Sequence, residues 1–210
     1  MRPRSLLGVC VGGCLLVVAC GSGPQHAPLV DDGTTSKPGG GGGPAPSGPQ
    51  SIDASLSWPG FAEGSTEASS VALAAYHDPD GSKGIHALLI TEVSFSCAAC
   101  LTETHDIVKN LAGPWKTLGV RVVQLVIDDA TGHLGKSTID SAKAWRDATG
   151  TTFAVGADPS FSFSHDGSNP MPQVLIVNPR NLAVVSRVEG YDPSETSLDV
   201  TALAHANGAN

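Results

Sequence analysis

Two cysteines separated by two alanines lie near the middle of the chain, in the stretch SFSCAACLTE at residues 94–103. Residues 85–93 before them read IHALLITEV, an apolar and β-branched run that predicts a buried strand. Apolar side chains recur at helical spacing after them, which predicts a helix. Cys97 and Cys100 therefore occupy the turn between a strand and a helix. A metal half-site, a structural disulfide or a redox pair would each suit that position.

Short apolar segments alternate with helical patterns from residue 56 onward. The expected strands are 71–76, 85–93, 120–127, 173–177 and 182–188. The first helix is expected to end at Gly113-Pro114, the second to run from a capping box at Ser137 and Asp140 to Gly150, and the third to span 198–206. This order of strands and helices predicts an α/β fold with a mixed sheet and helices on both faces.

The N-terminus predicts an export signal and not a part of the fold. Arg2 and Arg4 precede the apolar run 6–19, which is too short and too rich in glycine for a comfortable membrane span. The run ends in Val-Val-Ala-Cys-Gly. This resembles the lipobox of bacterial lipoproteins, which implies cleavage before Cys20 and attachment of lipid to it. Cys14 is a weaker candidate for the same role, and an ordinary cleaved signal that happens to contain cysteine is the other interpretation.

Residues 21–55 are dominated by glycine, proline and serine, with five consecutive glycines at 39–43. Such a composition cannot bury enough apolar surface to fold. We therefore expect 1–19 to be a signal, 20–55 a lipid-bearing tether and 56–210 a single folded domain. The chain has 12 basic and 20 acidic side chains, and no basic cluster follows the signal, so nucleic acid is not an expected partner.

Removal of the signal changes the cysteine count. Cys10 and Cys14 would leave with it and Cys20 would carry lipid, so Cys97 and Cys100 would be the only thiols of the mature chain. The space outside the inner membrane is oxidising and suits a pair that closes on itself. The start of a helix stabilises a thiolate, which makes Cys97 the expected nucleophile and Cys100, one turn further in, the resolving thiol.

The pair and a distant proline together resemble the thioredoxin superfamily. The resemblance covers about 61–206 and depends on the buried strand, the two cysteines, the helix after them, and Met171-Pro172 before the final hairpin. It implies a three-layer α/β/α fold, a cis Met171–Pro172 bond packed against the cysteines, and substrate binding by the Met171 backbone. The long interval from Cys100 to Pro172 resembles the redoxin branch, in which a further helix and strand intervene.

Several side chains depart from the thioredoxin pattern. Ser96 replaces the aromatic residue that precedes the first cysteine, and Thr91 stands where the family has a buried acid. Glu92 is one residue away and points to the opposite face of its strand, which weakens it as a proton shuttle. Glu103 is another weak candidate, because an acid near a helix start is favourable without any catalytic role.

Other interpretations of the pair stay open. Cys100-Leu-Thr-Glu103 resembles the C-x-T-E segment of peroxiredoxins, but Cys97 and Val93 occupy the positions of the threonine and proline that this family needs. A copper chaperone of thioredoxin fold would need three residues between the cysteines, although His165 could supply a distal ligand. Structural zinc would need a second pair of ligands. The pair could also be an inert disulfide in a binding domain.

The sequence thus predicts a thiol–disulfide oxidoreductase that needs no dissociable cofactor and no metal. Its active residues would be Cys97 and Cys100, with Met171 and Pro172 on the substrate side. The expected location is the bacterial cell envelope, with a lipid anchor on Cys20. By resemblance, the partners would be exported cysteine-containing proteins, such as an apocytochrome, and a membrane thiol carrier that donates electrons.

Overall fold

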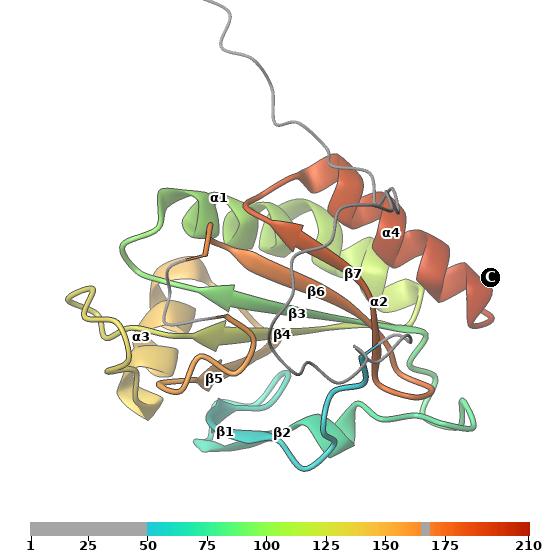
Figure 1. Cartoon of the computed structure of the whole chain (residues 1–210), viewed down its shortest axis with the longest axis horizontal. Helices are drawn as coiled ribbons and strands as arrows, with labels where there is room; N and C mark the ends of the chain where they lie inside the picture. The colour runs from blue at the N-terminus through green and yellow to red at the C-terminus, as the bar shows by residue number, and fades with distance from the viewer. Residues whose placement is uncertain (1–49, 165–168) are drawn as a thin grey trace, which may run out of the picture. The chain divides into compact units, whose positions relative to one another are not determined.

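A computed structural model describes residues 50–164 and 169–210 (Figure 1). The strands are β1 (Ser57–Phe61), β2 (Ser69–Ala72), β3 (Ala87–Val93), β4 (Val120–Val126), β5 (Ala154–Ala157), β6 (Gln173–Asn178) and β7 (Ala183–Glu189). The helices are α1 (Ala98–Asp106), α2 (Ala112–Thr117), α3 (Ile139–Thr149) and α4 (Pro193–Ala206), with a 3₁₀ turn η1 (Leu73–Ala75) and a π turn η2 (Ile107–Leu111). None of these helices is long and apolar enough to cross a membrane. The predicted signal, Cys20 and His165 lie outside the described residues.

The seven strands form one mixed sheet in the order β2-β1-β5-β4-β3-β6-β7. β3 pairs in parallel with β4, and β4 with β5, whereas the other neighbours are antiparallel. The central strands β3 and β4 are almost wholly buried, as their continuous apolar runs predict. The predicted α/β class with a mixed sheet is confirmed. β1 was not predicted, because Pro59 and Gly60 are poor strand formers.

All four α-helices pack on one face of the sheet. Leu89 of β3 packs there with Val200 of α4, and Val93 packs with Trp145 of α3 and Cys100 of α1. The crossovers β3-α1-β4 and β4-α3-β5 advance in the same direction across the sheet, so right-handed connections put α1 and α3 on the same side.

The other face of the sheet is covered differently. Leu88 and Ile90 of β3 point toward it and pack with Trp58 of β1, Leu73 of η1 and Tyr76. The helices expected on this face are not found there within residues 50–164 and 169–210. Strand β1, the turn η1 and loop segments cover this face instead. The strand predicted at 71–76 is wrong in its extent, because these residues form the end of β2 followed by η1.

The helix after the cysteines does not end at Gly113-Pro114 as predicted. It continues through η2 and α2 to Thr117. Pro114 is tolerated because it lies in the first turn of α2, directly after the π turn, where the helix does not require an N–H donor.

The start of α3 also differs from the prediction, although its end does not. Thr138 is the N-cap, and its N–H donates to the Ser141 hydroxyl at 3.1 Å in a reciprocal capping box, which shifts the box by one residue from Ser137 and Asp140. Gly150 ends the helix in the left-handed conformation, with φ at 71°, as predicted.

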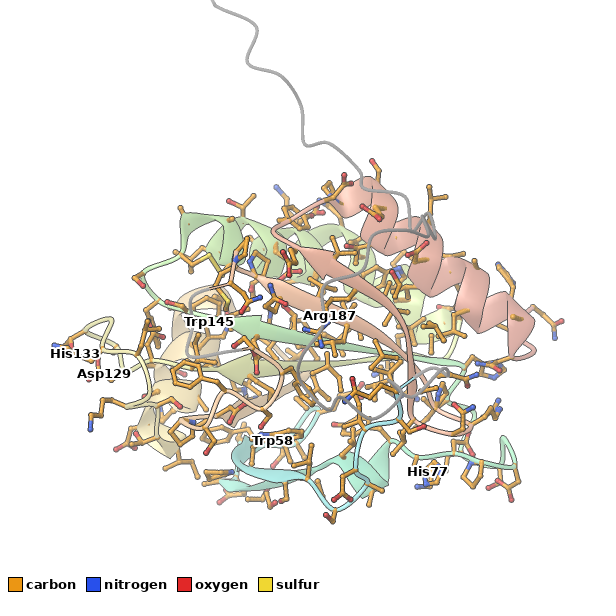
Figure 2. All side chains as sticks on the ribbon, in the orientation of Figure 1. Trp58, His77, Asp129, His133, Trp145 and Arg187 are labelled. Carbon is orange, nitrogen blue, oxygen red and sulfur yellow. A yellow bond between two sulfur atoms is a disulfide. The ribbon has the colours of Figure 1, made fainter. Side chains whose placement is uncertain are left out.

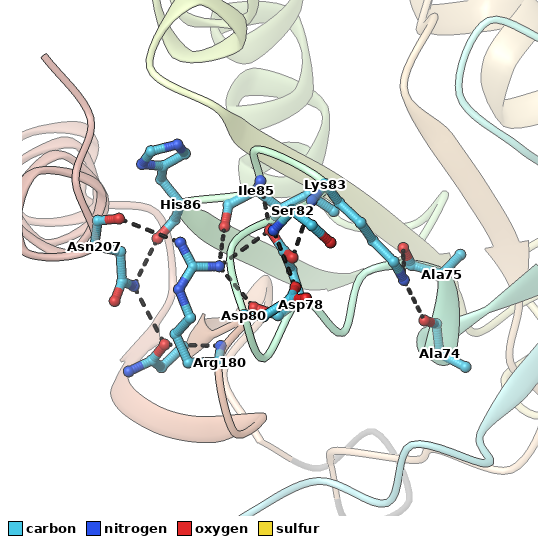
Figure 3. Close-up of polar contacts among 11 residues, drawn as sticks. Ala74, Ala75, Asp78, Asp80, Ser82, Lys83, Ile85, His86, Arg180 and Asn207 are labelled. Atoms are coloured by element: carbon cyan, nitrogen blue, oxygen red, sulfur yellow. Dashed lines mark hydrogen bonds and ion pairs between the residues drawn. The ribbon is translucent and has the colours of Figure 1, made fainter.

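The end of the sheet remote from the cysteines is held by Asp78 and Arg180 (Figure 3). The Asp78 carboxylate accepts the N–H groups of Lys83 and Ile85 and pairs with Arg180, each at 3.0 Å. Arg180 also donates to the carbonyls of Asp78, Ile85 and Asn207 at 2.6, 3.0 and 3.2 Å. Burial raises the pKa of Asp78, but these donors hold it below its ordinary value. The loop before β3, the β6–β7 turn and the C-terminal segment are thereby joined.

Residues 50–52 run beside β7, which is an outer strand of the sheet. The Val184 N–H donates to the Gln50 carbonyl at 3.1 Å, and the Ile52 N–H donates to the Leu182 carbonyl at 2.9 Å. Ser51 forms a β-bridge with Ala183. Contacts with the sheet thus begin within the segment that composition assigns to the tether.

Candidate redox site

Cys97 and Cys100 lie at the junction of β3 and α1 and are joined by a disulfide, with their Cα atoms 5.3 Å apart. Cys97 is the N-cap residue of α1, and its Sγ accepts a hydrogen bond from the Cys100 N–H at 3.0 Å. Cys100 is fully buried, whereas Cys97 is half-buried. A thiol or disulfide from solvent can therefore reach Cys97 and not Cys100. The helix start that the Cys97 sulfur caps would stabilise a thiolate there.

Met171-Pro172 lies directly before β6, in the same region of the fold as the cysteines. The peptide bond between the two residues is cis, as the resemblance implies. Met171 packs in the same apolar cluster as both cysteines. Pro172 is buried, and its carbonyl accepts the N–H of Gly190, which follows β7, at 2.9 Å. Two motifs far apart in the sequence thus meet at one site.

A buried carboxyl group lies one helical turn beyond Cys100. Glu103 is fully buried, and its Oε2 accepts a hydrogen bond from the Thr91 hydroxyl at 2.9 Å. Burial raises the pKa of Glu103 to about 8, although the Thr91 hydroxyl acts in the opposite direction. Residues three apart on a helix share a face, so Glu103 lies on the same side of α1 as Cys100. Thr91 occupies the position at which the thioredoxin superfamily has a buried acid, and α1 brings the Glu103 carboxyl group into contact with the Thr91 side chain.

The two candidate acids are therefore separated by the sheet. Glu92 points to the opposite face from Thr91, as predicted, and its Oε1 accepts the Phe163 N–H at 2.8 Å. Burial raises the pKa of Glu92 to about 7, and the neighbouring Asp158 carboxyl adds to the effect. The sequence favours Glu103 only weakly, yet it is the acid on the cysteine side. The three-residue spacing from Cys100 was the signal that could have identified it.

Buried polar groups tie α1 to β4 and α3 behind Cys100. The Thr104 hydroxyl donates to the Cys100 carbonyl at 2.8 Å, and the Gln124 amide donates to the Thr104 hydroxyl at 2.8 Å. The Trp145 indole (labelled in Figure 2) donates to the Gln124 Oε1 at 3.0 Å. Trp145 also meets Phe95 edge to face, with ring centroids 5.2 Å apart. This connected network fixes the helix that carries Cys100.

A carboxylate from the neighbouring strand holds the turn before Cys97. Asp128 lies just after β4 and is fully buried. Its two oxygens each accept the Phe95 N–H at 3.0 Å, and Oδ2 accepts the Ser94 hydroxyl at 2.6 Å. Sequence reasoning missed this residue. The signal was an acid directly after a buried run, because the ends of neighbouring parallel strands meet at one edge of a sheet.

Two further observations concern the metal and peroxidase alternatives. No group of three or more His, Cys, Asp and Glu side chains could hold a metal ion in the part of the chain that the structure describes. His133 lies on an exposed loop, where it pairs with Asp129 at 3.2 Å (Figure 2). The Thr102 hydroxyl donates to the Ala98 carbonyl of its own helix at 3.0 Å, and Cys97 occupies the position of the threonine that the peroxiredoxin motif needs.

A cavity of about 390 Å³ lies on the sheet face without helices and is separate from the cysteines. Its lining includes Leu56, Phe161, Phe163 and Arg187, the last of which is labelled in Figure 2. An exchange reaction with another protein requires an accessible sulfur on the surface, which Cys97 supplies, and does not require an enclosed cavity.

Three of the solved structures with similar architecture are named as thiol:disulfide interchange proteins. A thiol:disulfide interchange protein of the thioredoxin family from Chlorobium tepidum TLS matches with a TM-score of 0.52 and 14% identity, over 76% of this chain and 99% of that one. A candidate thiol:disulfide interchange protein DsbE from Chlorobium tepidum matches with a TM-score of 0.52 and 18% identity, over 77% of this chain and 100% of that one. The fold is thioredoxin-like.

A third structure, a thiol:disulfide interchange protein from Bacteroides sp., matches this thioredoxin-like chain at 0.50 and 15% identity, over 73% of this chain and 91% of that one. No protein-family model matches the sequence, and no curated protein matches it. Identities this low establish the fold alone.

Proposed function

We propose that this thioredoxin-like domain is a thiol–disulfide oxidoreductase, with Cys97 as nucleophile and Cys100 as resolving thiol. The observation that carries the proposal is the meeting of three features at one point. These are the disulfide whose half-buried Cys97 caps α1, the cis Met171-Pro172 bond whose Met171 packs in the same apolar cluster, and the buried Glu103 on the same side of α1. A disulfide with only a structural role would need neither an accessible sulfur nor a buried acid.

In the reducing direction, the Cys97 thiolate attacks one sulfur of a substrate disulfide, and the other substrate sulfur leaves as a thiolate. The Cys100 thiol then loses its proton and attacks Cys97 in the mixed disulfide. This step releases the second substrate thiolate and leaves Cys97 and Cys100 joined. The substrate gains two electrons and the pair loses two, and the reverse sequence oxidises a substrate dithiol.

Glu103 is the group that can take the proton from Cys100. Cys100 is fully buried, so water cannot act on it directly. The Glu103 pKa of about 8 lies close to the ordinary thiol value of about 8.5, so proton transfer between them is nearly balanced. The Thr91 hydroxyl holds the carboxyl group in place. We therefore assign to Glu103 the proton transfer that the resemblance gives to an acid at position 91.

Equilibration of the oxidised protein with a glutathione or dithiothreitol couple tests the proposal. We expect a reversible two-electron transition, together with reduction of insulin disulfides. Cys100→Ser should accumulate a mixed disulfide through Cys97, and the matched variant Cys97→Ser should accumulate none. A pair that stays oxidised under strong reductant, with no insulin turnover, would contradict the proposal and favour the inert disulfide.

We further propose that the protein is exported and anchored by lipid on Cys20, with exported cysteine-containing proteins as substrates and a membrane thiol carrier as electron donor. The proposal is supported by the apolar run that ends in a lipobox-like segment. Cleavage before Cys20 and lipid on Cys20 would also leave Cys97 and Cys100 as the only thiols. Cys20→Ser should move the protein from the membrane fraction to the soluble fraction, whereas Cys14→Ser should not. The reverse result would assign the anchor to Cys14.

A further inference from the structure

The carboxylate of Asp128 is buried beside the redox pair, yet it takes no part in the steps above. It accepts the Ser94 hydroxyl at 2.6 Å and the Phe95 N–H at 3.0 Å. In each contact the side chain is the acceptor, as the ionised form requires. Among residues 50–164 and 169–210, none of the ion pairs includes Asp128. Its charge is therefore balanced by dipoles and not by a cation.

The contacts of Asp128 continue to the nucleophile. The Ser94 hydroxyl, which donates to Asp128, also contacts the Ser96 hydroxyl at 2.8 Å. The Ser94 carbonyl accepts the Cys97 N–H at 3.2 Å. The loop that Asp128 begins packs on the same turn, since a Cβ at Gly132 would lie 3.5 Å from the Cβ of Ser96. The carboxylate thus holds the whole turn that presents Cys97.

We propose that Asp128 is a positioning residue that also tunes the redox pair, because its negative charge opposes formation of the Cys97 thiolate. A buried charge is screened less than an exposed one and acts over a longer distance. The disulfide is uncharged, and the reduced pair becomes charged when Cys97 ionises. Asp128 therefore favours the oxidised form and makes the pair a stronger reductant, against the opposite effect of the helix start. This inference rests on the proposed function.

Asp128→Asn keeps the shape of the side chain and removes its charge. In the reduced protein, the ratio of thiolate to thiol at Cys97 at pH 7 should rise by roughly threefold to tenfold, measured by thiolate absorbance and by alkylation rate. Above the pH at which Cys97 ionises, the equilibrium constant for reduction should rise by the same factor. For a two-electron couple that factor corresponds to about 14–30 mV.

Two further variants separate the charge effect from a loss of structure. Asp129→Asn makes the same chemical change one residue away, on a partly exposed side chain whose carboxylate accepts the Thr131 hydroxyl at 2.6 Å. It should change neither the thiolate ratio nor the equilibrium constant for reduction. Ser94→Ala removes a donor to Asp128 but keeps the negative charge, so the thiolate ratio should stay level or fall. A purely structural role predicts that Ser94→Ala and Asp128→Asn shift the ratio in the same direction.

The outcomes are distinguishable. The inference is wrong if Asp128→Asn changes neither the thiolate ratio at Cys97 nor the equilibrium constant for reduction, or if Ser94→Ala shifts the thiolate ratio in the same direction as Asp128→Asn. In either case a reversible redox transition of the wild type still supports the proposed function. If the wild-type pair cannot be reduced at all, both fail. Should Asp128→Asn not fold, Ser94→Ala decides alone, because a rise in its thiolate ratio overturns the inference and a level or lower ratio supports it.

Discussion

Replacement of Glu103 by Gln should stabilise the oxidised domain at neutral and alkaline pH. Burial raises the pKa of Glu103 from its ordinary value of 4.5 to about 8 in the folded protein, and unfolding restores the ordinary value. Between these values the folded state keeps a proton that the unfolded state loses. The stability that Glu103 contributes is therefore fully present below about pH 4.5 and is lost as the pH rises through about 8. Gln is uncharged at every pH and escapes this loss.

The size of the effect follows from the pKa shift. Each pKa unit corresponds to about 1.4 kcal/mol, so the loss between pH 4.5 and 7 is about 3 kcal/mol. The Thr91 hydroxyl can donate to the Gln carbonyl as it does to the acid. We expect the free energy of unfolding of Glu103→Gln to exceed that of the wild type by roughly 2–3 kcal/mol at pH 7, with near equality at pH 4.5. Urea unfolding of the oxidised proteins across this pH range measures it.

The same substitution should slow catalysis, because Cys100 loses its proton acceptor. Insulin reduction should fall by roughly 10²-fold, the usual contribution of a general base, while alkylation of Cys97 changes little. Glu92→Gln is the matched control. It removes a buried carboxyl of raised pKa from the other face of the sheet, so it should flatten the pH dependence of stability below about pH 7 and spare turnover. The reasoning is refuted if Glu103→Gln is no more stable than the wild type at pH 8.

Three other outcomes are expected. Arg180→Met removes the donors that join three segments at the far end of the sheet, and it should lower the melting temperature on the order of 10 °C without moving the reduction potential. Trp145→Phe leaves the buried Gln124 oxygen without its donor and should cost about 1–3 kcal/mol in urea unfolding. In the reduced protein, iodoacetamide should modify Cys97 roughly tenfold faster or more than Cys100, measured by peptide mass, because Cys100 is buried at the helix interior.

The local parts of the site could be predicted from the sequence, and the long-range parts could not. The strand before Cys97 and the helix after it follow from apolar periodicity, which is a property of neighbouring residues. The meeting of Met171-Pro172 with the cysteines came from family resemblance, since no local pattern brings those residues together. The role of Asp128 depends on β3 and β4 being parallel neighbours, which only the sheet reveals.

The layer arrangement was unpredictable for a similar reason. The position of α3 depends on β5, a short strand of small residues that pairs in parallel with β4. Because β5 extends the sheet in the same direction as the step from β3 to β4, the right-handed crossover connections place α3 on the same face as α1. The alternation of helices and strands in the sequence does not indicate on which side of β4 the strand β5 is added.

The pairing of residues 50–52 with β7 has a consequence for how copies of the protein behave toward one another. Outer strands present unpaired N–H and C=O groups that readily recruit a strand from another molecule. Here the Val184 N–H and the Leu182 carbonyl are already occupied by Gln50 and Ile52. A chain cut at residue 56 would leave that edge bare. The last residues of the tether therefore protect this part of the sheet edge from pairing with the edge of another molecule.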